Sequence, residues 1–365
     1  MTGIEQVAAA LDRLVAEGRV VGYVLGLAAD GRTRVVAGGA SALGGPAMGE
    51  DAQFPLSSNT KPIGGVLAMR LVELGVLALD APVDEHLPEL AHPSVLTRPD
   101  GPLDEVVTAE RPITLRHLLT MTPGFGWINE NGPLSAAMDE RRISPGPYPP
   151  PMSHDEYLRR LGELPLADQP GRHWRYHNSS DVIGVLLARA TGRPVSELLD
   201  EYVLGPLGMS ETGFIGDPAR MPTSYGADAD GNLEALNLPD DVFRTAPRFE
   251  SLACGLVSTV RDYLRFLSAL SHGAPVLSRG SVIQLGSDQL TAGQRETAAG
   301  LLETGCGYGF HVEVRPDGSI GWAGGLGTIG YTNPLTGKSA ALFTAQSFEA
   351  PGTAEAFEEF WPLLR

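Results

Sequence analysis

Residues 54–63 read Phe54-Pro55-Leu56-Ser57-Ser58-Asn59-Thr60-Lys61-Pro62-Ile63. They lead directly into apolar residues at helical spacing, namely Val66, Leu67, Met69, Leu71, Val72 and Leu74. On a helix, Ser58 and Lys61 would lie on one face because they are three residues apart. Pro62 has no N–H to return to the Ser58 carbonyl. We therefore expect the helix to begin just after Ser58, with this serine near the positive end of the helix dipole.

The pair has the composition of a nucleophile and its base. A serine hydroxyl attacks poorly until a base takes its proton, and a lysine amine can do so if burial lowers its pKa. The chain contains only two lysines, Lys61 and Lys338, so 27 − 2 = 25 of its basic residues are arginine. Arginine does not give up its proton in proteins. The alternative is an ordinary exposed lysine in a first helical turn, and the pair alone does not decide between them.

Bulk composition narrows the class of protein. A chain of 365 residues can hold two ordinary domains or one large enzyme domain. Its net charge of −17 argues against a nucleic-acid partner, which needs a basic face. With only Cys254 and Cys306 present, we expect two buried free thiols rather than a disulfide framework.

The N-terminal residues show no basic segment followed by an apolar core, and no apolar run reaches the roughly 18 residues of a membrane span. These observations predict a cytoplasmic protein without membrane contact. A chain trimmed of its signal peptide would look the same.

Periodicity predicts strands at both ends of the chain and helices between them. A helix is expected over 4–17, followed by a hairpin of 20–27 and 34–37 around Asp30-Gly31. The helix after Lys61 should end near Leu74-Gly75. Further helices are expected over 113–121 (capped by Thr114), 181–190, 195–204 and 261–270, and a long loop over Phe125–Pro151 is typical of a lid or binding loop. Short strands over 308–315, 320–323, 329–333 and 339–345 precede a last helix over 353–364.

This order of elements predicts an α/β fold of the α+β type, in which both chain ends build one antiparallel sheet flanked by helices. Without a low-complexity linker, 1–365 should be a single catalytic unit. Within it, 1–60 and 250–365 would form an α/β lobe, and 61–249 a mostly helical lobe inserted between them.

Two further motifs carry chemistry. Tyr176-x-Asn178 places a potential acid or base two residues before an asparagine expected to cap the next helix. Around Trp322-Ala323-Gly324-Gly325, small residues would let a substrate lie against the backbone, so that an N–H could reach an oxyanion. Each also has an ordinary interpretation, as a half-buried tyrosine before a helix cap and as a tight turn in a glycine-rich hairpin.

Several other patterns lack the context that their chemistry needs. Residues 325–330 match G-x-G-x-x-G, but no helix follows to bind a phosphate. No G-x-S-x-G elbow occurs, which argues against an α/β-hydrolase. His173 and His177 are four residues apart without an evident acidic third ligand, so no metal site is expected, and no organic cofactor is implied.

In this order, Ser58-x-x-Lys61, Tyr176-x-Asn178 and Trp322-x-Gly324 resemble the motifs of the serine β-lactamase and penicillin-binding-protein superfamily. The branch that they resemble most closely is that of class C β-lactamases and the family VIII carboxylesterases. The resemblance runs over nearly the whole chain and includes segments 117–124 and 204–209. It implies a β-lactamase/transpeptidase-like fold.

The sequence departs from the superfamily at the third motif. β-Lactamases and DD-peptidases usually carry Lys or His there, and that cation helps to bind the substrate carboxylate. Trp322 is neutral and donates only through its indole N–H. Losing a charge partner for a buried carboxylate costs roughly 2–5 kcal/mol, whereas an ester without a carboxylate loses nothing.

The resemblance therefore implies a serine hydrolase that cleaves carboxylic esters through an acyl-enzyme on Ser58. Lys61 and Tyr176 would share the role of base, and the N–H groups of Ser58 and Gly325 would form the oxyanion hole. Asn178 would orient Lys61 or a substrate carbonyl. The remaining residues expected to bind substrate are Trp322, Gly324, Trp127 and Asn129, with the Phe125–Pro151 loop and the 215–250 region as walls.

Three alternatives stay open: a β-lactamase or D-amino-acid amidase or peptidase at the same site, an acyltransferase to an alcohol or amine, and a non-catalytic binding or sensor module. The expected partner is a small-molecule ester, and the oligomeric state is open.

Overall fold

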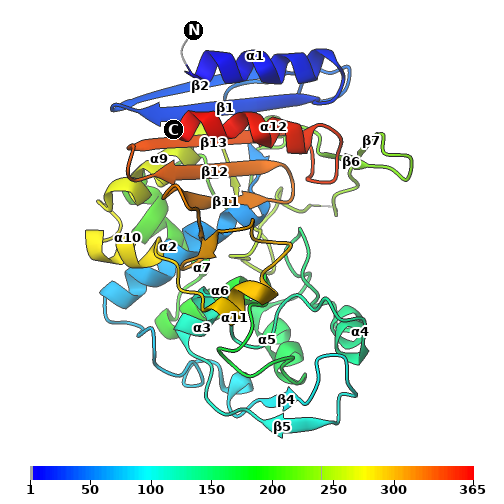
Figure 1. The fold of residues 1–365 in the computed structure, drawn as a ribbon, viewed down its shortest axis with the longest axis vertical. Helices are drawn as coiled ribbons and strands as arrows, with labels where there is room; N and C mark the ends of the chain where they lie inside the picture. Colours follow the sequence, from blue (N-terminus) through cyan, green and yellow to red (C-terminus); the bar gives the residue numbers. More distant parts are fainter. Residues whose placement is uncertain (1–2, 240) are drawn as a thin grey trace.

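Both ends of the chain build the central sheet (Figure 1). The computed structural model describes residues 3–239 and 241–365. Its main sheet has seven strands in the order β2-β1-β13-β12-β11-β10-β9. Their bounds are β1 Gly22–Ala29, β2 Arg32–Gly39, β9 Gly307–Tyr308, β10 Glu313–Val314, β11 Ile320–Gly324, β12 Thr328–Asn333 and β13 Lys338–Thr344. β1 pairs antiparallel with β13, which confirms the predicted sheet made from the two ends.

Alternating side chains bury both faces of this sheet. On β1, Tyr23 and Leu25 belong to the apolar cluster that also contains residues of α1 (Gly3–Ala16), α12 (Thr353–Phe360) and the 3-10 turn η4 (Trp361–Leu364). Val24 points the other way, into the larger core. On the same side, Gly26 leaves room for Val260 and Leu264 of α9 (Val260–His272). The period of two along the strand thus joins a terminal helical layer to the rest of the molecule.

The segment between the chain ends is mostly helix and loop, and it lies on the α9 side of the sheet (Figure 1). Its helices and turns are α2 Thr60–Glu73, η2 Pro88–Leu90, α3 Leu115–Leu119, α4 Pro133–Glu140, α5 His154–Gly162, α6 Asn178–Thr191, α7 Val195–Leu199, η3 Asp200–Leu204 and α8 Gly205–Leu207. Short strand pairs join β3 (Phe54–Pro55) to β8 (Val257–Ser258), β4 (Ser94–Leu96) to β5 (Val106–Thr108), and β6 (Tyr225–Ala227) to β7 (Leu233–Ala235). Helices α10 (Arg279–Leu285) and α11 (Ala292–Thr297) follow α9.

Most of the predicted elements are confirmed, including the Thr114 cap, whose side chain accepts from His117 N–H. The single strand predicted over 308–315 is wrong. The structure has two short strands, β9 and β10, joined by a turn in which Gly309 N–H donates to Val312 O and His311 has φ of 65°. A residue in that left-handed region cannot continue an extended strand. Helix α4 lies inside the segment predicted as loop.

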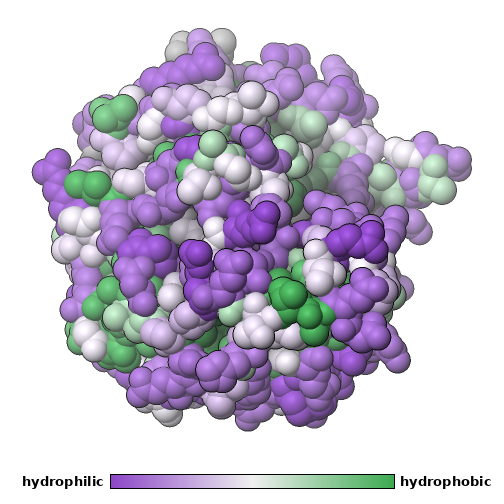
Figure 2. Space-filling model, turned by 60° about the horizontal axis from the view of Figure 1, so that its bottom comes forward, coloured by the Kyte–Doolittle hydropathy of each residue, from purple (hydrophilic) through white to green (hydrophobic). Residues whose placement is uncertain are grey.

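The surface is largely hydrophilic on the face shown in Figure 2, with apolar side chains scattered in small groups. The β6–β7 hairpin stands out from the body in both views (Figures 1 and 2). Cys254 and Cys306 are buried and unpaired, as predicted. Among the described residues, no helix combines the length and the apolar character needed to cross a membrane.

Candidate active site

Ser58 lies in a 3-10 turn, η1 (Ser57–Asn59), directly before α2, as the position of Pro62 predicted. The preceding residue, Ser57, has φ of 47°, a conformation that costs a non-glycine residue about 1–3 kcal/mol. The turn is held from behind by Asn59, whose amide donates to Thr328 Oγ1 at 3.1 Å and whose Oδ1 accepts from Tyr263 at 3.0 Å. Ser58 itself stays partly exposed, so that a substrate can reach it.

Lys61 is completely buried below this serine. Its Nζ lies 2.9 Å from Ser58 Oγ, donates to Ala253 O at 2.8 Å and lies 3.5 Å from His177 Nδ1. The centroid of the Tyr176 ring lies 4.5 Å from the same nitrogen. Burial lowers the pKa of Lys61 to about 8, and the neighbouring Cys254 and Asp181 oppose that shift. A fraction of the amine is therefore neutral and basic near neutral pH.

The carbonyl that holds Lys61 is tied to α6 through a second network. Asp181 accepts from Ser251 Oγ at 2.6 Å, and Ser251 Oγ accepts from the N–H groups of Ala253 and Cys254 at 3.1 Å each. All of these residues are buried. Burial raises the pKa of the Asp181 carboxyl, while the Ser251 hydrogen bond and the charge of Lys61 oppose that rise.

Tyr176 reaches the site from the residues just before α6, and its side chain is 6% exposed. Trp322 Nε1 donates to its hydroxyl oxygen at 2.6 Å, and Ser58 hydrogen-bonds the same phenol. Burial raises the pKa of Tyr176, and these two hydrogen bonds oppose the rise. The phenol is therefore protonated in the free protein near neutral pH.

Aromatic rings fix the position of Tyr176. Its ring stacks on Trp174 with centroids 5.4 Å apart, and Trp322 lies 5.6 Å away on β11. Tyr308 packs edge-on against both tryptophans. His177, the next residue, has φ of 88°, so strained backbone flanks both Ser58 and Tyr176. Burial and the charge of Lys61 hold the pKa of His177 well below its usual range, so the imidazole is neutral.

The end of β11 packs against the turn that carries Ser58. A Cβ at Gly324 would lie 2.2 Å from Leu56 O, so only glycine fits there. The carbonyl of Gly325 accepts from Phe348 N–H at 3.0 Å. In the part of the chain that the structure describes, the N–H groups of Ser58 and Gly325 have no main-chain acceptor. Both donors are thus available for an oxyanion.

Asn178 does not cap α6, and that prediction is wrong. His177 is the residue at the cap, and Asn178 is the first residue of the helix. Its amide instead donates to Ile143 O and to Tyr157 Oη, at 2.8 Å each. Because the strained His177 directs the chain into α6, the Asn178 side chain faces the 142–151 segment and α5. Its Oδ1 is buried without a hydrogen-bond partner.

The remaining residues singled out from the sequence lie at the surface or outside the Ser58–Lys61 contact. Trp127 is 44% exposed, and its backbone N–H donates to Tyr176 O at 2.8 Å. Asn129 is also exposed. His173 Nδ1 lies 2.7 Å from Asp168 Oδ1, whereas His177 faces Lys61. No cluster of three or more His, Cys, Asp or Glu side chains suited to a metal ion occurs within residues 3–239 and 241–365.

Sequence reasoning missed the four residues that surround Lys61 from behind, namely His177, Asp181, Ser251 and Ala253. Ala253 acts through its carbonyl, which no residue type can signal. His177 and Asp181 are two of five consecutive polar residues that follow Tyr176 and are all buried, so residue type alone does not single them out.

Known proteins resemble this chain in sequence and in fold. The sequence profile of the family described as Beta-lactamase matches residues 7–359. Protein Rv1367c of Mycobacterium tuberculosis is 34% identical over 315 residues, which cover 80% of this chain and 76% of that protein. Esterase EstB of Burkholderia gladioli is 32% identical over 373 residues, covering 93% and 90%. Among solved structures, EstCE1, "a hydrolase with promiscuous acyltransferase activity", superposes with a TM-score of 0.85 at 24% identity and covers 100% of this chain and 98% of its own.

Proposed function

The chain belongs to the beta-lactamase family, and from this premise we propose that it hydrolyses carboxylic esters through an acyl-enzyme on Ser58. One observation carries the proposal. A partly exposed serine hydroxyl lies 2.9 Å from the amine of a fully buried lysine whose pKa is lowered. The similarity to an esterase over nine tenths of both chains supports the choice of ester chemistry.

In the first half-reaction, the neutral amine of Lys61 takes the proton from Ser58 Oγ as this oxygen attacks the ester carbonyl carbon. The N–H groups of Ser58 and Gly325 donate to the oxyanion that forms. When the carbon–oxygen bond to the alcohol breaks, Tyr176 gives its proton to the leaving alkoxide and regains one from the Lys61 ammonium. The raised pKa of Tyr176 favours this division, with Lys61 as the base and Tyr176 as the acid.

In the second half-reaction, a water molecule attacks the acyl carbon. Its proton passes to the basic pair of Tyr176 and Lys61, and Ser58 Oγ leaves and is reprotonated. Because the two groups interact, we assign the base role to the pair in this step. The products are a carboxylic acid and the free enzyme.

Neutral esters suit this site better than substrates that carry a carboxylate. Trp322 is uncharged, so it offers no cation at the third motif. Its only polar hydrogen is directed at Tyr176. β-Lactams and D-amino-acid peptides would lack that partner for their carboxylate. Acyl transfer is the second candidate, because an alcohol in place of water would give a new ester from the same acyl-enzyme, and EstCE1 is described as performing both reactions.

The test compares Ser58→Ala and Lys61→Arg with the unaltered protein on p-nitrophenyl acetate and butyrate. Both variants should lose about three orders of magnitude in kcat, because each removes a member of one catalytic unit. Circular dichroism and thermal unfolding establish that the variants fold. Full turnover by folded Ser58→Ala would overturn the proposal. Nitrocefin assayed in parallel measures lactam cleavage, and product analysis with added alcohols measures transfer.

A further inference from the structure

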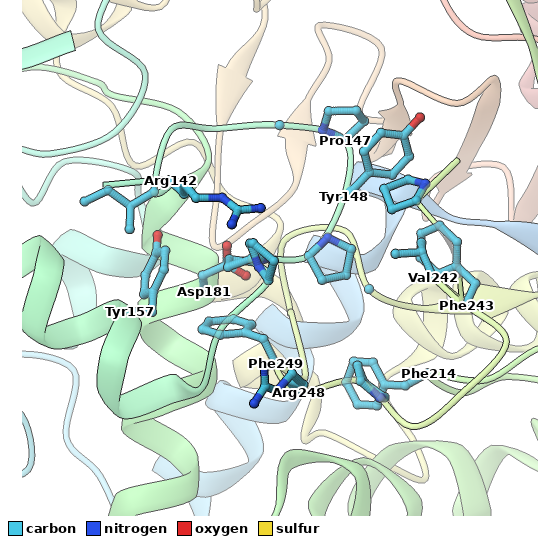
Figure 3. A pocket seen from close by; sticks show the side chains of 18 of the residues that line it. Arg142, Pro147, Tyr148, Tyr157, Asp181, Phe214, Val242, Phe243, Arg248 and Phe249 are labelled. Atoms are coloured by element: carbon cyan, nitrogen blue, oxygen red, sulfur yellow. The ribbon is translucent and has the colours of Figure 1, made fainter. Parts of the chain in front are cut away.

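A cavity of about 660 Å³ opens on the far side of the residues that surround Lys61. Two segments form its walls, residues 142–151 on one side and Pro239 with 241–249 on the other. These segments fall within the two regions that the sequence predicted as walls. Asn178 and Asp181 of α6 and Tyr157 of α5 lie at its inner end. Figure 3 shows Tyr157 and Asp181 on one side of the space and Val242 and Phe243 on the other.

Prolines and aromatic rings make up a large part of the lining. The prolines are Pro147, Pro149, Pro150, Pro151, Pro239 and Pro247. The aromatic residues are Tyr148, Tyr157, Phe214, Phe243 and Phe249. Proline fixes the backbone angle φ, so these walls lose little conformational freedom when a ligand binds. Aromatic faces offer large apolar contact areas, which favour other rings.

Most polar groups at the inner end are engaged within the protein, and the exception is Asn178 Oδ1, which has no hydrogen-bond partner among the described residues. Asp181 accepts from Ser251, and Tyr157 Oη accepts from Asn178. Arg142 and Arg248 lie at the exposed rim, where water solvates them. Proline carbons and ring faces cover much of the wall between these polar groups, which is the environment of a mainly apolar ligand.

The cavity lies next to the catalytic residues, although Ser58, Lys61 and Tyr176 are not among the residues that line it. His177 lines it, and the Nδ1 atom of His177 lies 3.5 Å from Lys61 Nζ, which in turn lies 2.9 Å from Ser58 Oγ. Gly255 also lines it, two residues after the Ala253 carbonyl that accepts from Lys61. Phe243 of the cavity wall belongs to the same apolar cluster as Leu326, the residue after Gly325, so the cavity also lies near the proposed oxyanion donor.

We propose that this cavity binds a bulky, neutral, ring-containing part of the ester while the ester group lies at Ser58. The inference rests on the proposed ester hydrolysis and adds the substrate class. A volume of about 660 Å³ falls in the range that encloses most of a drug-sized molecule, which is roughly 300–1,000 Å³. An acetyl or butyryl group would leave most of it empty. The preferred substrates are therefore aryl or polycyclic esters rather than short-chain ones.

Gly146 offers a way to fill the cavity without altering a catalytic residue. It lines the space, and a Cβ built on it meets no atom within 4 Å. Gly146→Trp should therefore fold and place an indole in the cavity. Gly280 on α10 provides the matched control, because it is exposed, lies outside the cavity lining, and a Cβ there meets only Ser278 Oγ at 3.8 Å.

Binding is measured apart from catalysis in the Ser58→Ala background. The neutral fluorophore N-phenyl-1-naphthylamine should bind, with a rise in fluorescence on leaving water. Gly146→Trp should weaken its affinity at least tenfold, and Gly280→Trp should leave it unchanged. Absence of saturable binding, or equal affinity in the Gly146→Trp protein, would overturn the inference.

Kinetics test the same point with substrate. These measurements use the protein with Ser58 intact. A 1-naphthyl ester supplies a bulky group on the alcohol side, and p-nitrophenyl 1-naphthoate supplies one on the acyl side. For each of these esters, kcat/KM is divided by kcat/KM for p-nitrophenyl acetate. Gly146→Trp should lower at least one of the two ratios by tenfold or more, and Gly280→Trp should change neither. If both ratios persist, the substrate class is wrong although ester hydrolysis stands. If turnover of every ester is independent of Ser58, the proposed function fails, whatever the fluorophore shows.

Discussion

The indole nitrogen of Trp322 lies 2.6 Å from the hydroxyl oxygen of Tyr176, to which its N–H donates. This hydrogen bond joins β11 of the main sheet to the residue that precedes α6 by two positions. It also explains what the uncharged third motif does in this protein. The side chain that replaces a substrate-binding cation lies in the aromatic cluster around Tyr176, together with Trp174 and Tyr308.

Trp322→Phe tests the importance of that bond. The substitution keeps an aromatic ring but removes the donor that favours negative charge on the Tyr176 oxygen. We expect kcat for p-nitrophenyl acetate to fall about tenfold, the equivalent of one ordinary hydrogen bond of ~1.4 kcal/mol. Trp361→Phe, a substitution on the far helical layer, should leave kcat unchanged. An unaltered kcat in Trp322→Phe would mean that Tyr176 works without this donor.

The lowered pKa of Lys61 predicts how ester hydrolysis depends on pH. Below about pH 8 the amine is protonated and cannot accept the Ser58 proton, so kcat/KM should rise with pH and level off above that value. The free energy of unfolding changes with pH in the same direction. An unfolded lysine keeps its proton to about pH 10.4, so the unfolded chain binds more protons between these values and this group favours folding increasingly as pH rises.

Steady-state values of kcat/KM on a neutral ester, measured from pH 6 to 9.5, test this pH dependence. Lys338→Arg alters the only other lysine, on β13, and should keep the profile. A profile that is flat over this range would show that the neutral amine of Lys61 is not the base.

The sequence predicted those parts of the site that depend on neighbours along the chain. Ser58 and Lys61 are three residues apart where the η1 turn leads directly into α2, so their spacing alone brings them together. Pro62 likewise placed the start of α2. The sheet was predictable because two hairpin-like ends with alternating apolar residues have few other ways to bury both faces.

What the sequence could not supply are contacts between distant segments. The Ala253 carbonyl reaches Lys61 across 192 positions, and Ser251 is 70 positions from Asp181. Local preference predicts Asn178 at the helix cap. Its side chain bonds instead to Ile143 and Tyr157, because tertiary hydrogen bonds outweigh the weaker local one.

Arg175 should be essential to stability. Its buried guanidinium bonds Asp168 at 2.6 Å and Glu130 at 2.8 Å, and so fastens the segment after Trp127 to the residue before Tyr176. Arg175→Met leaves the buried Asp168 carboxylate without its strongest partner, at a cost on the order of 3 kcal/mol in the free energy of unfolding. Urea denaturation followed by fluorescence measures the loss.

Arg159→Met is the matched control, because the ion pairs of Arg159 among the described residues are with Glu156 and Glu163 at the surface, and its loss should cost much less. Equal losses in the two variants would contradict a special role for the buried pair.

Asp181→Asn separates charge from geometry in the network behind Lys61. Asparagine keeps an oxygen that can accept from Ser251, so the tie to the Ala253 carbonyl persists while the negative charge is lost. That charge raises the pKa of Lys61 against its burial, and the other groups around the amine are the neutral His177 and the Cys254 thiol. The rise of kcat/KM with pH should therefore have its midpoint at lower pH in Asp181→Asn. Ser251→Ala keeps the charge and cuts the tie, so it should lower kcat with a smaller change in the midpoint. Should Asp181→Asn reduce activity at every pH and leave the midpoint in place, Asp181 would support the fold alone and the charge coupling to Lys61 would be refuted.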